Sequence, residues 1–336
     1  MRVGLLGAGN ISDTHARAAR AIPGVEIAAV CGANREKVAR LAHAHGGVAY
    51  DAIDAFLAHR PMDIVAIGSP SGLHADHTIA AMRRGLHVLV EKPLDVTRAK
   101  VDTVIAEAAR AGVKVGVFFQ DRLRPDVAAM KELIDAGRLG KPVFASGRVK
   151  WYRPPEYYGT SRWRGTCALD GGGALMNQGI HTVDLLQWLF GPVARVCART
   201  ATRIHAIEAE DTAAAVLEFE SGALGVIEAT TSVFPGYARR VELTGAEGTL
   251  ILEGDRLVAA DLRNAVDVRT ASPTDLESTA SPVVSDCTPH QRVFEDFIRA
   301  IETNGTPACD AREGRHSVAI VEAIYRSARD GGFQEP

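Results

Sequence analysis

The chain has 336 residues, of which 46% are hydrophobic and 24% are charged, and its formal net charge is −3 at pH 7. This length suffices for two domains, each with its own hydrophobic core. The nearly balanced charge argues against a nucleic-acid or anionic-membrane partner, because both favour concentrated positive charge. No apolar run approaches the roughly twenty residues that cross a bilayer, and the N-terminus has no signal-peptide pattern, so we expect a cytoplasmic protein.

The cysteines are five in number, lie far apart and include no Cys-x-x-Cys pair. An odd count argues against a closed disulfide framework, and the wide spacing argues against a thiolate metal site. Composition therefore indicates an ordinary globular protein without a cysteine-based scaffold.

The first 120 residues alternate short apolar segments with amphipathic ones in a regular order. The apolar segments, which we predict to be strands, are 3–6, 26–30, 63–68, 87–90 and 113–119. The amphipathic segments, which we predict to be helices, are 11–21, 35–44, 53–59, 74–84 and 97–111. Strands that are apolar throughout and alternate with helices indicate a parallel sheet covered on both faces. We therefore predict an α/β, doubly wound domain over residues 1–122.

The pattern changes near residue 122. A predicted helix at 127–136 precedes a strand at 143–151, in which apolar and polar residues alternate as in a strand with one solvated face. Further strands are predicted at 193–203, 213–220, 224–231, 240–245 and 249–252, and further helices after the glycine run to about 190, at 291–302 and at 312–329. The Ser-, Thr- and Pro-rich segment 272–289 is predicted to be a loop.

Short turns such as Glu220-Ser221-Gly222 between these strands indicate antiparallel neighbours. We expect residues 123–336 to form an α+β domain with an open, mostly antiparallel sheet, whose last helices are able to pack back on the first domain. Few helical segments follow the strands, so one sheet face lacks a cover within the chain. Such faces usually bind a symmetric copy, and we expect a homo-dimer or tetramer.

The first predicted strand leads directly into Gly7-Ala8-Gly9-Asn10-Ile11-Ser12. Gly7 permits a tight bend, and Gly9 lets the backbone approach a pyrophosphate. The following helix offers free N–H groups and the positive end of its dipole to that anion. Glycine turns between strand and helix also occur for steric reasons alone, but the position at the start of a βαβ unit favours dinucleotide binding.

The end of the second predicted strand bears on which dinucleotide binds. NAD-specific domains usually place an acidic residue about twenty positions beyond the glycines, where it accepts from the ribose 2′-hydroxyl. Here the position reads Cys31-Gly32-Ala33-Asn34-Arg35, with no carboxylate. Arg35 could bind the 2′-phosphate of NADP, or it could simply begin the next helix in solvent. The choice between NAD and NADP therefore stays open.

Two further segments follow strands at the same predicted sheet edge, where doubly wound folds bind ligands. Ser69-Pro70-Ser71 offers hydroxyls that can donate to a ribose or phosphate, although such turns also exist without a ligand. In Glu91-Lys92-Pro93, the lysine can hydrogen-bond a substrate hydroxyl and lower its pKa. A lysine leaving a buried strand is often only a surface residue, but the dinucleotide turn in the same sheet favours the functional interpretation.

The densest polar segment of the second domain runs from Asp170 to Asp184. Its glycines, 171–173, permit close backbone approach, and the predicted helix places Asn177 and His181 on one face. The pKa of a neutral imidazole suits it to take a proton from an alcohol as hydride leaves the carbon, and Asp184 could orient the ring. A structural histidine is the alternative. We predict no metal, because no third ligand lies at a usable spacing.

With these motifs in place, the chain resembles the Gfo/Idh/MocA family, the group of glucose-fructose oxidoreductase and inositol dehydrogenase, over essentially its full length. The resemblance rests on Gly7-Ala8-Gly9-Asn10-Ile11, Ser69-Pro70 with His74, Glu91-Lys92-Pro93-Leu94, Gln120 with Arg122, and Gly171-Gly172-Gly173 leading to His181. It implies a Rossmann domain that binds NAD(P), a second domain for substrate binding and oligomerisation, and hydride transfer at a ring carbon of a sugar, sugar derivative or cyclitol.

The resemblance also implies residue roles. Lys92 would touch both the nicotinamide and the reacting hydroxyl, and His181 would be the catalytic histidine. Many family members carry Asp four residues before this histidine, whereas this chain has Asn177. An amide cannot accept a proton, so His181, helped by Lys92, must handle the proton alone.

The candidate site residues fall into overlapping groups. The candidate catalytic residues are Lys92, His181 and Asn177. The candidate cofactor-binding residues are Gly7, Gly9, Asn10, Ile11, Arg35, Ser69, His74, Glu91, Lys92, Gln120 and Trp163. The candidate substrate-binding residues are Lys92, Arg122, Tyr152, Tyr158, Asn177 and His181.

The run Trp163-Arg164-Gly165-Thr166 with Asn177-Gln178-Gly179-Ile180-His181 also looks like the subgroup that oxidises the 3-hydroxyl of nucleotide-linked sugar uronates. A sugar or a nucleotide sugar is therefore the expected small-molecule partner. Two alternatives are a non-catalytic, nucleotide-binding regulatory protein of the same fold and a glycosidase that uses NAD. The joint presence of Lys92 and His181 favours the dehydrogenase or reductase.

Overall fold

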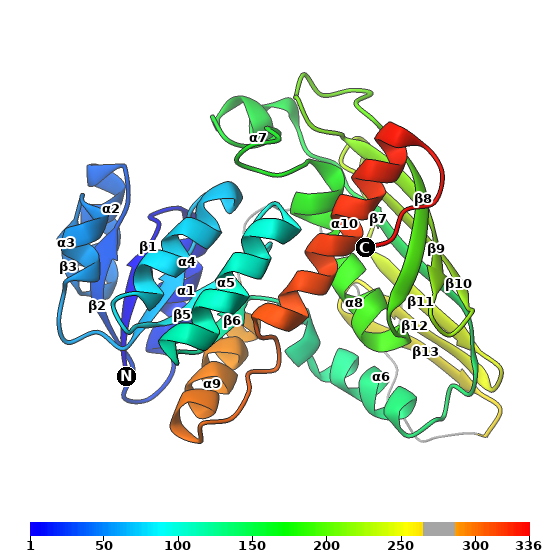
Figure 1. The fold of residues 1–336 in the computed structure, drawn as a ribbon, viewed down its shortest axis with the longest axis horizontal. Coiled ribbons are helices and arrows are strands. Elements are labelled where there is room, and N and C mark those ends of the chain that lie inside the picture. Colours follow the sequence, from blue (N-terminus) through cyan, green and yellow to red (C-terminus); the bar gives the residue numbers. More distant parts are fainter. Residues whose placement is uncertain (265–285) are drawn as a thin grey trace. The chain divides into compact units, whose positions relative to one another are not determined.

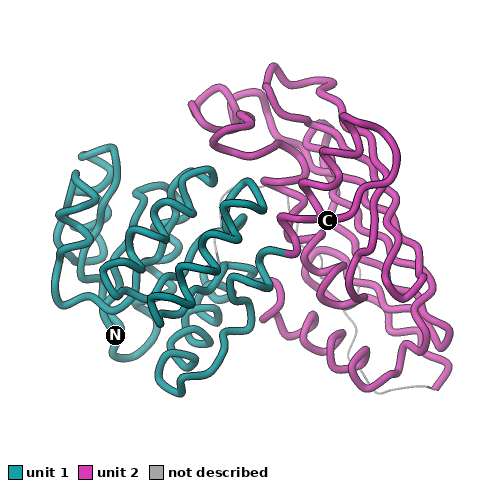
Figure 2. The backbone as a smooth tube through the Cα atoms, in the orientation of Figure 1, with its two compact units in different colours: residues 1–120, 283–315 teal, residues 121–282, 316–336 magenta. Residues whose placement is uncertain are grey.

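The computed structural model describes residues 1–264 and 286–336. The chain divides into two compact units, of which unit 1 comprises residues 1–120 and 283–315 and unit 2 comprises residues 121–282 and 316–336 (Figure 2). Unit 1 is thus discontinuous in sequence, because residues 283–315 join residues 1–120. Most of the loop predicted at 272–289 lies outside the described residues.

Unit 1 is built on a parallel sheet with the strand order β3-β2-β1-β4-β5-β6 (Figure 1). The strands are β1 (Arg2–Leu6), β2 (Glu26–Cys31), β3 (Val48–Tyr50), β4 (Ile64–Ile67), β5 (His87–Val90) and β6 (Val115–Val117). The chain proceeds outward from β1 to one edge and then returns to continue from β4 to the other. This order confirms the doubly wound sheet, and it places a topological switch point between β1 and β4.

Helices of unit 1 follow the strands as the sequence predicts. They are α1 (Asn10–Arg20), α2 (Arg35–His45), α3 (Ile53–Leu57), α4 (His74–Met82), α5 (Arg98–Ala111) and α9 (Thr288–Glu302). The side chain of Thr97 caps α5, and Gly112 ends it with φ of 66°, a conformation that glycine adopts without strain. Although α9 is distant in sequence, it packs against α1 in this unit.

Unit 2 contains a second sheet with the order β13-β12-β11-β7-β10-β9-β8. The strands are β7 (Pro142–Lys150), β8 (Val193–Ala201), β9 (Thr212–Phe219), β10 (Leu224–Thr230), β11 (Arg240–Gly245), β12 (Gly248–Glu253) and β13 (Arg256–Leu262). All neighbours are antiparallel except β7 and β10, which run parallel. The mostly antiparallel sheet is therefore confirmed.

The helices of unit 2 include α6 (Pro125–Asp135), α7 (Pro155–Gly159), α8 (Ile180–Phe190) and α10 (Ala311–Asp330), of which residues 316–330 belong to this unit. Figure 1 shows α8 and this part of α10 on one face of the sheet. A Cβ atom on Gly147 of β7 would lie 2.8 Å from Leu186 in α8, so a glycine permits this close packing. Every described helix is too short or too polar to span a membrane.

The other face of this sheet exposes apolar side chains. Phe144 in β7 pairs with Leu224 in β10, and Val216 in β9 pairs with Val226, two residues further along β10. Because side chains alternate along strands, these residues share one face. Phe144, Val216 and Leu224 are 40%, 44% and 48% exposed.

Candidate active site

The turn after β1 has the geometry that a dinucleotide requires. Gly7 has φ of 132°, and a Cβ atom there would lie 2.6 Å from the carbonyl oxygen of Gly68. Gly9 begins α1 without a side-chain cap, and a Cβ atom on it would meet nothing within 4 Å. Open space beside the first N–H groups of α1, at Asn10 and Ile11, fits a pyrophosphate bound at a helix N-terminus.

The next feature of this sheet edge is a carboxylate that the sequence analysis missed. Asp51 follows β3, whose last residue Tyr50 pairs with Cys31 at the end of β2. Its side chain forms an ion pair with Arg35, and the two side chains are 51% and 83% exposed. Burial and the nearby Asp51 raise the pKa of the Cys31 thiol. An acidic side chain therefore lies beside Arg35, although the end of β2 itself carries none.

His74 has a structural role rather than the cofactor contact expected from the sequence. Its side chain is buried, with Nδ1 2.7 Å from the Pro93 carbonyl oxygen and Nε2 2.8 Å from the Ser69 carbonyl oxygen. Burial lowers the pKa of His74 although both carbonyls favour the charged form. The imidazole thus joins the segments after β4 and β5, while the Ser69 hydroxyl lies 2.9 Å from Nδ1 of His77.

The side chain of Glu91, a candidate cofactor-binding residue, also turns inward. The side chain is buried, and Oε1 accepts from Nε2 of His15 at 3.0 Å. Lys92 follows at the carboxyl end of β5, as predicted. Gln120 begins a 3₁₀ turn (Gln120–Leu123), and its buried amide oxygen has no hydrogen-bond partner among the described residues.

In unit 2, the group beside the candidate catalytic histidine is Asp121. Oδ2 of Asp121 lies 3.5 Å from Nδ1 of His181, and the same carboxylate forms ion pairs with Arg239 and Arg124. Burial alone would raise the pKa of Asp121, but the positive charge of Arg239, with His181 and Arg124, holds it well below its usual range. An ionised carboxylate therefore faces the imidazole.

Asp184 does not orient His181, contrary to the expectation from helix spacing. Its two oxygens accept hydrogen bonds from Arg122 at 2.7 and 2.8 Å, and Ser317 donates a third at 2.9 Å. Arg122 and Asp184 are 2% and 1% exposed. This buried pair ties α8 to the start of unit 2, and the expected substrate contact of Arg122 is not supported by its geometry.

Asn177 lies in a π-helix over Ala174–Gly179, immediately before α8. The sequence predicts one continuous α-helix here, whereas the structure has a wider turn of the kind frequent at functional sites. The Asn177 amide donates to Asp170, and its oxygen accepts from Gln178 at 2.8 Å. These bonds fix the orientation of the amide.

A cavity of about 780 Å³ in unit 2 has a mixed lining of polar, charged and apolar residues, which includes the carboxylate of Glu208. Its lining includes Tyr158, Arg162 and Arg164. Tyr158 donates to Thr231 at 3.0 Å, and burial raises its pKa to about 12. Tyr152 packs edge-on against Phe234 with ring centroids 5.3 Å apart, and the guanidinium of Arg164 lies 5.5 Å from the ring centroid of Trp163.

Comparisons with known proteins agree with this geometry. The model of the oxidoreductase family with an NAD-binding Rossmann fold matches residues 1–119, and the model of the GFO/IDH/MocA C-terminal domain matches residues 127–251. The chain is 29% identical to D-apiose dehydrogenase of Paraburkholderia graminis, covering 97% of this chain and 87% of that protein. It is 31% identical to D-xylose 1-dehydrogenase (NADP(+)) 2 of Haloferax volcanii, covering 100% and 99%.

The crystal structure of the WlbA dehydrogenase from Bordetella pertussis in complex with NADH and UDP-GlcNAcA is similar over both units. Its TM-score is 0.90, the identity is 32%, and the similarity covers 100% of this chain and 97% of that one. This similarity covers the whole chain. It therefore includes the doubly wound sheet, the dinucleotide turn, the segment around Lys92 and the segment before His181. The chain belongs to the GFO/IDH/MocA family of NAD(P)-dependent oxidoreductases.

Proposed function

We propose that the protein transfers a hydride between NAD(P) and a hydroxyl-bearing ring carbon of a sugar, sugar derivative or cyclitol. The observation that carries the proposal is the ionised Asp121 carboxylate 3.5 Å from His181. A carboxylate beside an imidazole stabilises the imidazolium that forms when the ring accepts a proton. The relatives named as apiose and xylose dehydrogenases support the substrate class.

Each residue has a defined task in this proposal. Bound NAD(P) supplies the hydride acceptor or donor at its nicotinamide ring. Lys92 donates a hydrogen bond to the reacting oxygen and stabilises its negative charge as the proton leaves. His181 takes that proton during oxidation and returns it during reduction, while Asp121 holds the charge of the ring. Asn177 orients the substrate with its fixed amide and takes no part in proton transfer.

A nucleotide-linked sugar acid is the substrate that we propose within this class. The similar WlbA structure contains UDP-GlcNAcA, and Arg162 and Arg164 line the cavity of unit 2 beside Tyr158. Guanidinium groups bind carboxylates and phosphates in a bidentate manner. The two arginines outnumber the one lining carboxylate, Glu208, and are therefore suitable partners for an anionic sugar.

The direct test is to mix the purified protein with NAD or NADP and a panel of sugars, cyclitols and nucleotide sugars while following NAD(P)H absorbance. Lys92→Ala and His181→Ala should each lower kcat by about 10²–10⁴-fold with little change in NADH affinity. NADH binding without turnover of any panel member, or normal turnover by both variants, would instead favour the non-catalytic regulatory protein. Release of a free sugar without net NADH formation would identify the NAD-dependent glycosidase.

We also propose that the protein is a homo-oligomer that associates through the exposed face of the unit 2 sheet. The face carries Phe144, Val216 and Leu224 side by side, each at least 40% exposed. Contiguous exposed apolar side chains mark association surfaces, and a symmetric copy is their commonest partner.

A further inference from the structure

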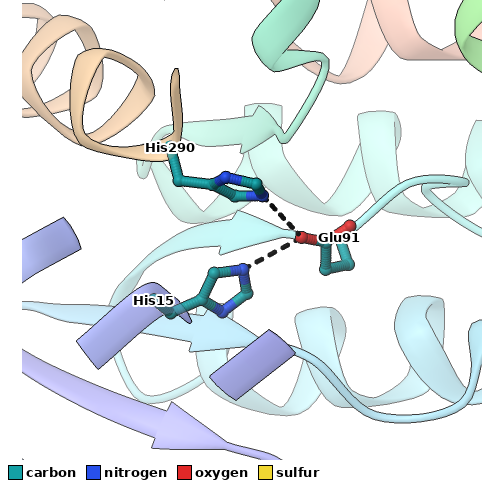
Figure 3. Close-up of side chains that lie close together, drawn as sticks. All are labelled: His15, Glu91 and His290. Carbon is teal, nitrogen blue, oxygen red and sulfur yellow. Dashed lines mark hydrogen bonds and ion pairs between the residues drawn. The ribbon is translucent and has the colours of Figure 1, made fainter. Parts of the chain in front are cut away.

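A buried cluster of three ionisable side chains lies within unit 1 and includes Glu91, the residue that precedes Lys92. His15 comes from α1, Glu91 from the end of β5 and His290 from the first turn of α9, and Figure 3 shows both rings directed at the carboxylate. The three residues are 0%, 8% and 2% exposed. Nε2 of His15 lies 3.0 Å from Oε1 of Glu91, and Nε2 of His290 lies 3.7 Å from the same oxygen.

The charge states in this cluster follow from its surroundings. Burial would raise the pKa of Glu91, but the hydrogen bond from His15 and the adjacent His290 hold it well below its usual range. Burial lowers the pKa of His15. The carboxylate is therefore ionised and can only accept, so the neutral ring of His15 must carry its proton on Nε2.

The cluster has little freedom to rearrange. The ring of His15 is stacked on Phe118 with centroids 4.2 Å apart, and Phe294 lies edge-on at 6.2 Å. Nδ1 of His15 and Nδ1 of His290 are buried and have no hydrogen-bond partner among the described residues. Each ring therefore makes its polar contact through Nε2, and both Nε2 atoms are directed at Glu91.

The second oxygen of Glu91 connects the cluster to the proposed catalytic lysine. Oε2 accepts a hydrogen bond from the main-chain N–H of Lys92 at 3.2 Å. On the other side of Lys92, the carbonyl oxygen of Pro93 is held by His74 at 2.7 Å. The backbone at Lys92 is therefore fixed on both sides by buried, directional contacts rather than by apolar packing alone.

We propose that His15 and His290 are positioning residues, which act through Glu91 to fix the main chain from which Lys92 reaches the reacting hydroxyl. This inference rests on the role of Lys92 under the proposed function. A misplacement of about 1 Å at a reacting group can lower a rate by about 10²-fold. A rigid main chain at Lys92 would therefore keep the rate high.

A metal site is the competing explanation, since the three ligand atoms lie within 4.8 Å of one another. The geometry favours hydrogen bonding. A distance of 3.0 Å between His15 and Glu91 is that of a direct hydrogen bond. Histidines bound to metal almost always donate their second ring N–H to a neighbouring acceptor, whereas both Nδ1 atoms here lack one among the described residues.

The first experiment compares His15→Leu, His15→Gln, His290→Leu and His290→Gln with the wild type. Leucine fills the space without donating, whereas the glutamine amide can donate to Glu91. We expect both leucine variants to lower kcat by about 10- to 100-fold while the NADH dissociation constant changes less than about twofold, and we expect glutamine to restore most of the loss. His59→Leu is the matched control, since it removes an imidazole that bonds Tyr50 at 2.9 Å elsewhere in unit 1.

The second experiment does not depend on turnover. Hydrogen exchange at the Lys92 amide should be slow in the wild type and faster in His15→Leu and in Glu91→Gln. In the first variant Oε2 is displaced, and in the second a single amide oxygen remains for the two donors, His15 and the Lys92 N–H. Nitrogen NMR of the histidine side chains should show His15 as the neutral, Nε2-protonated form. If Lys92→Ala turns over normally, the proposed function fails, but these two measurements still test the cluster.

Three results would overturn the inference. One is a stoichiometric transition metal in the protein by elemental analysis. Another is equal behaviour of the leucine and glutamine variants, with losses that only follow thermal stability. The third is an unchanged exchange rate at Lys92 in both His15→Leu and Glu91→Gln. Should the leucine variants of His15 and His290 not fold, their glutamine variants and Glu91→Gln are compared with the wild type in the same assays.

Discussion

Asp121 is the charged residue that contacts His181, the proposed proton acceptor. It lies 3.5 Å from His181 and also pairs with the buried Arg239. We expect Asp121→Asn to lower kcat by about tenfold or more, as part of the 10²–10⁴-fold that an acid–base group contributes. The NADH dissociation constant should stay unchanged, which fluorescence titration would check. Wild-type kcat in this variant would show that the carboxylate does not assist His181.

The same carboxylate predicts how stability depends on pH. The folded-state pKa of Asp121 is depressed, so its contribution to stability is present above the unfolded-state value of about 3.9 and is lost as the pH falls below it. We expect the free energy of unfolding to fall more steeply between pH 5 and pH 3 in the wild type than in Asp121→Asn. Urea denaturation across this range measures the difference, and parallel curves would contradict the assignment.

Asn177 offers a second test at the residue scale, because its amide donates to the buried Asp170. In Asn177→Asp, two carboxylates would face each other, so the pKa of the new acid should rise. The variant should be less stable than the wild type by about 1–2 kcal/mol at pH 8, where both acids would be charged, and nearly as stable near pH 4. Thermal unfolding at the two pH values decides the matter. Equal stability at both would mean that the pair relaxes apart.

Sequence spacing could select candidate catalytic residues but not the side chains that contact them. Asp184 is one helical turn from His181, yet its carboxylate is bound by Arg122. Asp121 lies sixty positions before His181 and meets it only because the chain folds back. The sequence did contain one signal for Asp121: it is a charged residue between Gln120 and Arg122, which are both candidate site residues.

At the scale of elements, the apolar strands and the helices between them in unit 1 were predictable, whereas β3 and the π-helix were not. β1, β2, β4 and β5 lie within about one residue of their predicted bounds. β3 has only three residues and follows two glycines, so it carries too little periodicity to be recognised. Missing β3 also meant missing Asp51. The π-helix before α8 has no sequence signature that distinguishes it from an α-helix.

The ion pair between Arg35 and Asp51 lies at the ends of neighbouring elements. We predict that these two residues control the relative affinity for NADPH and NADH. Arg35→Ala should weaken NADPH binding about tenfold or more and NADH binding little, because a 2′-phosphate needs the guanidinium. Asp51→Ala should have the opposite effect, since it removes a repulsive charge and frees Arg35 for phosphate. Titration of both variants with both cofactors checks this. Equal changes for NADH and NADPH would leave the pair as a surface contact only.

For the whole molecule, the exposed sheet face predicts assembly. Light scattering at micromolar concentration should give the mass of a dimer or a tetramer. Val216→Lys should reduce that mass, because a charged side chain buried in an apolar interface is strongly disfavoured. Val48→Lys, which places the same charge on an exposed valine of β3 in unit 1, serves as the control. A monomeric wild type would contradict the prediction.

The return of α9 to unit 1 has a consequence for the order of events during synthesis. Phe294 and Phe297 of this helix are fully buried, and Gly116 of β6 lies against the ring of Phe297. The residues needed to complete the nucleotide-binding core therefore leave the ribosome after nearly all of unit 2 has been made. Domains generally fold from the N-terminus during translation, but here residues 1–120 must wait with an incomplete apolar surface. Unit 2 also waits, because its residues 316–336 follow α9 in the chain. Both units should therefore complete their cores only when nearly the whole chain has been made.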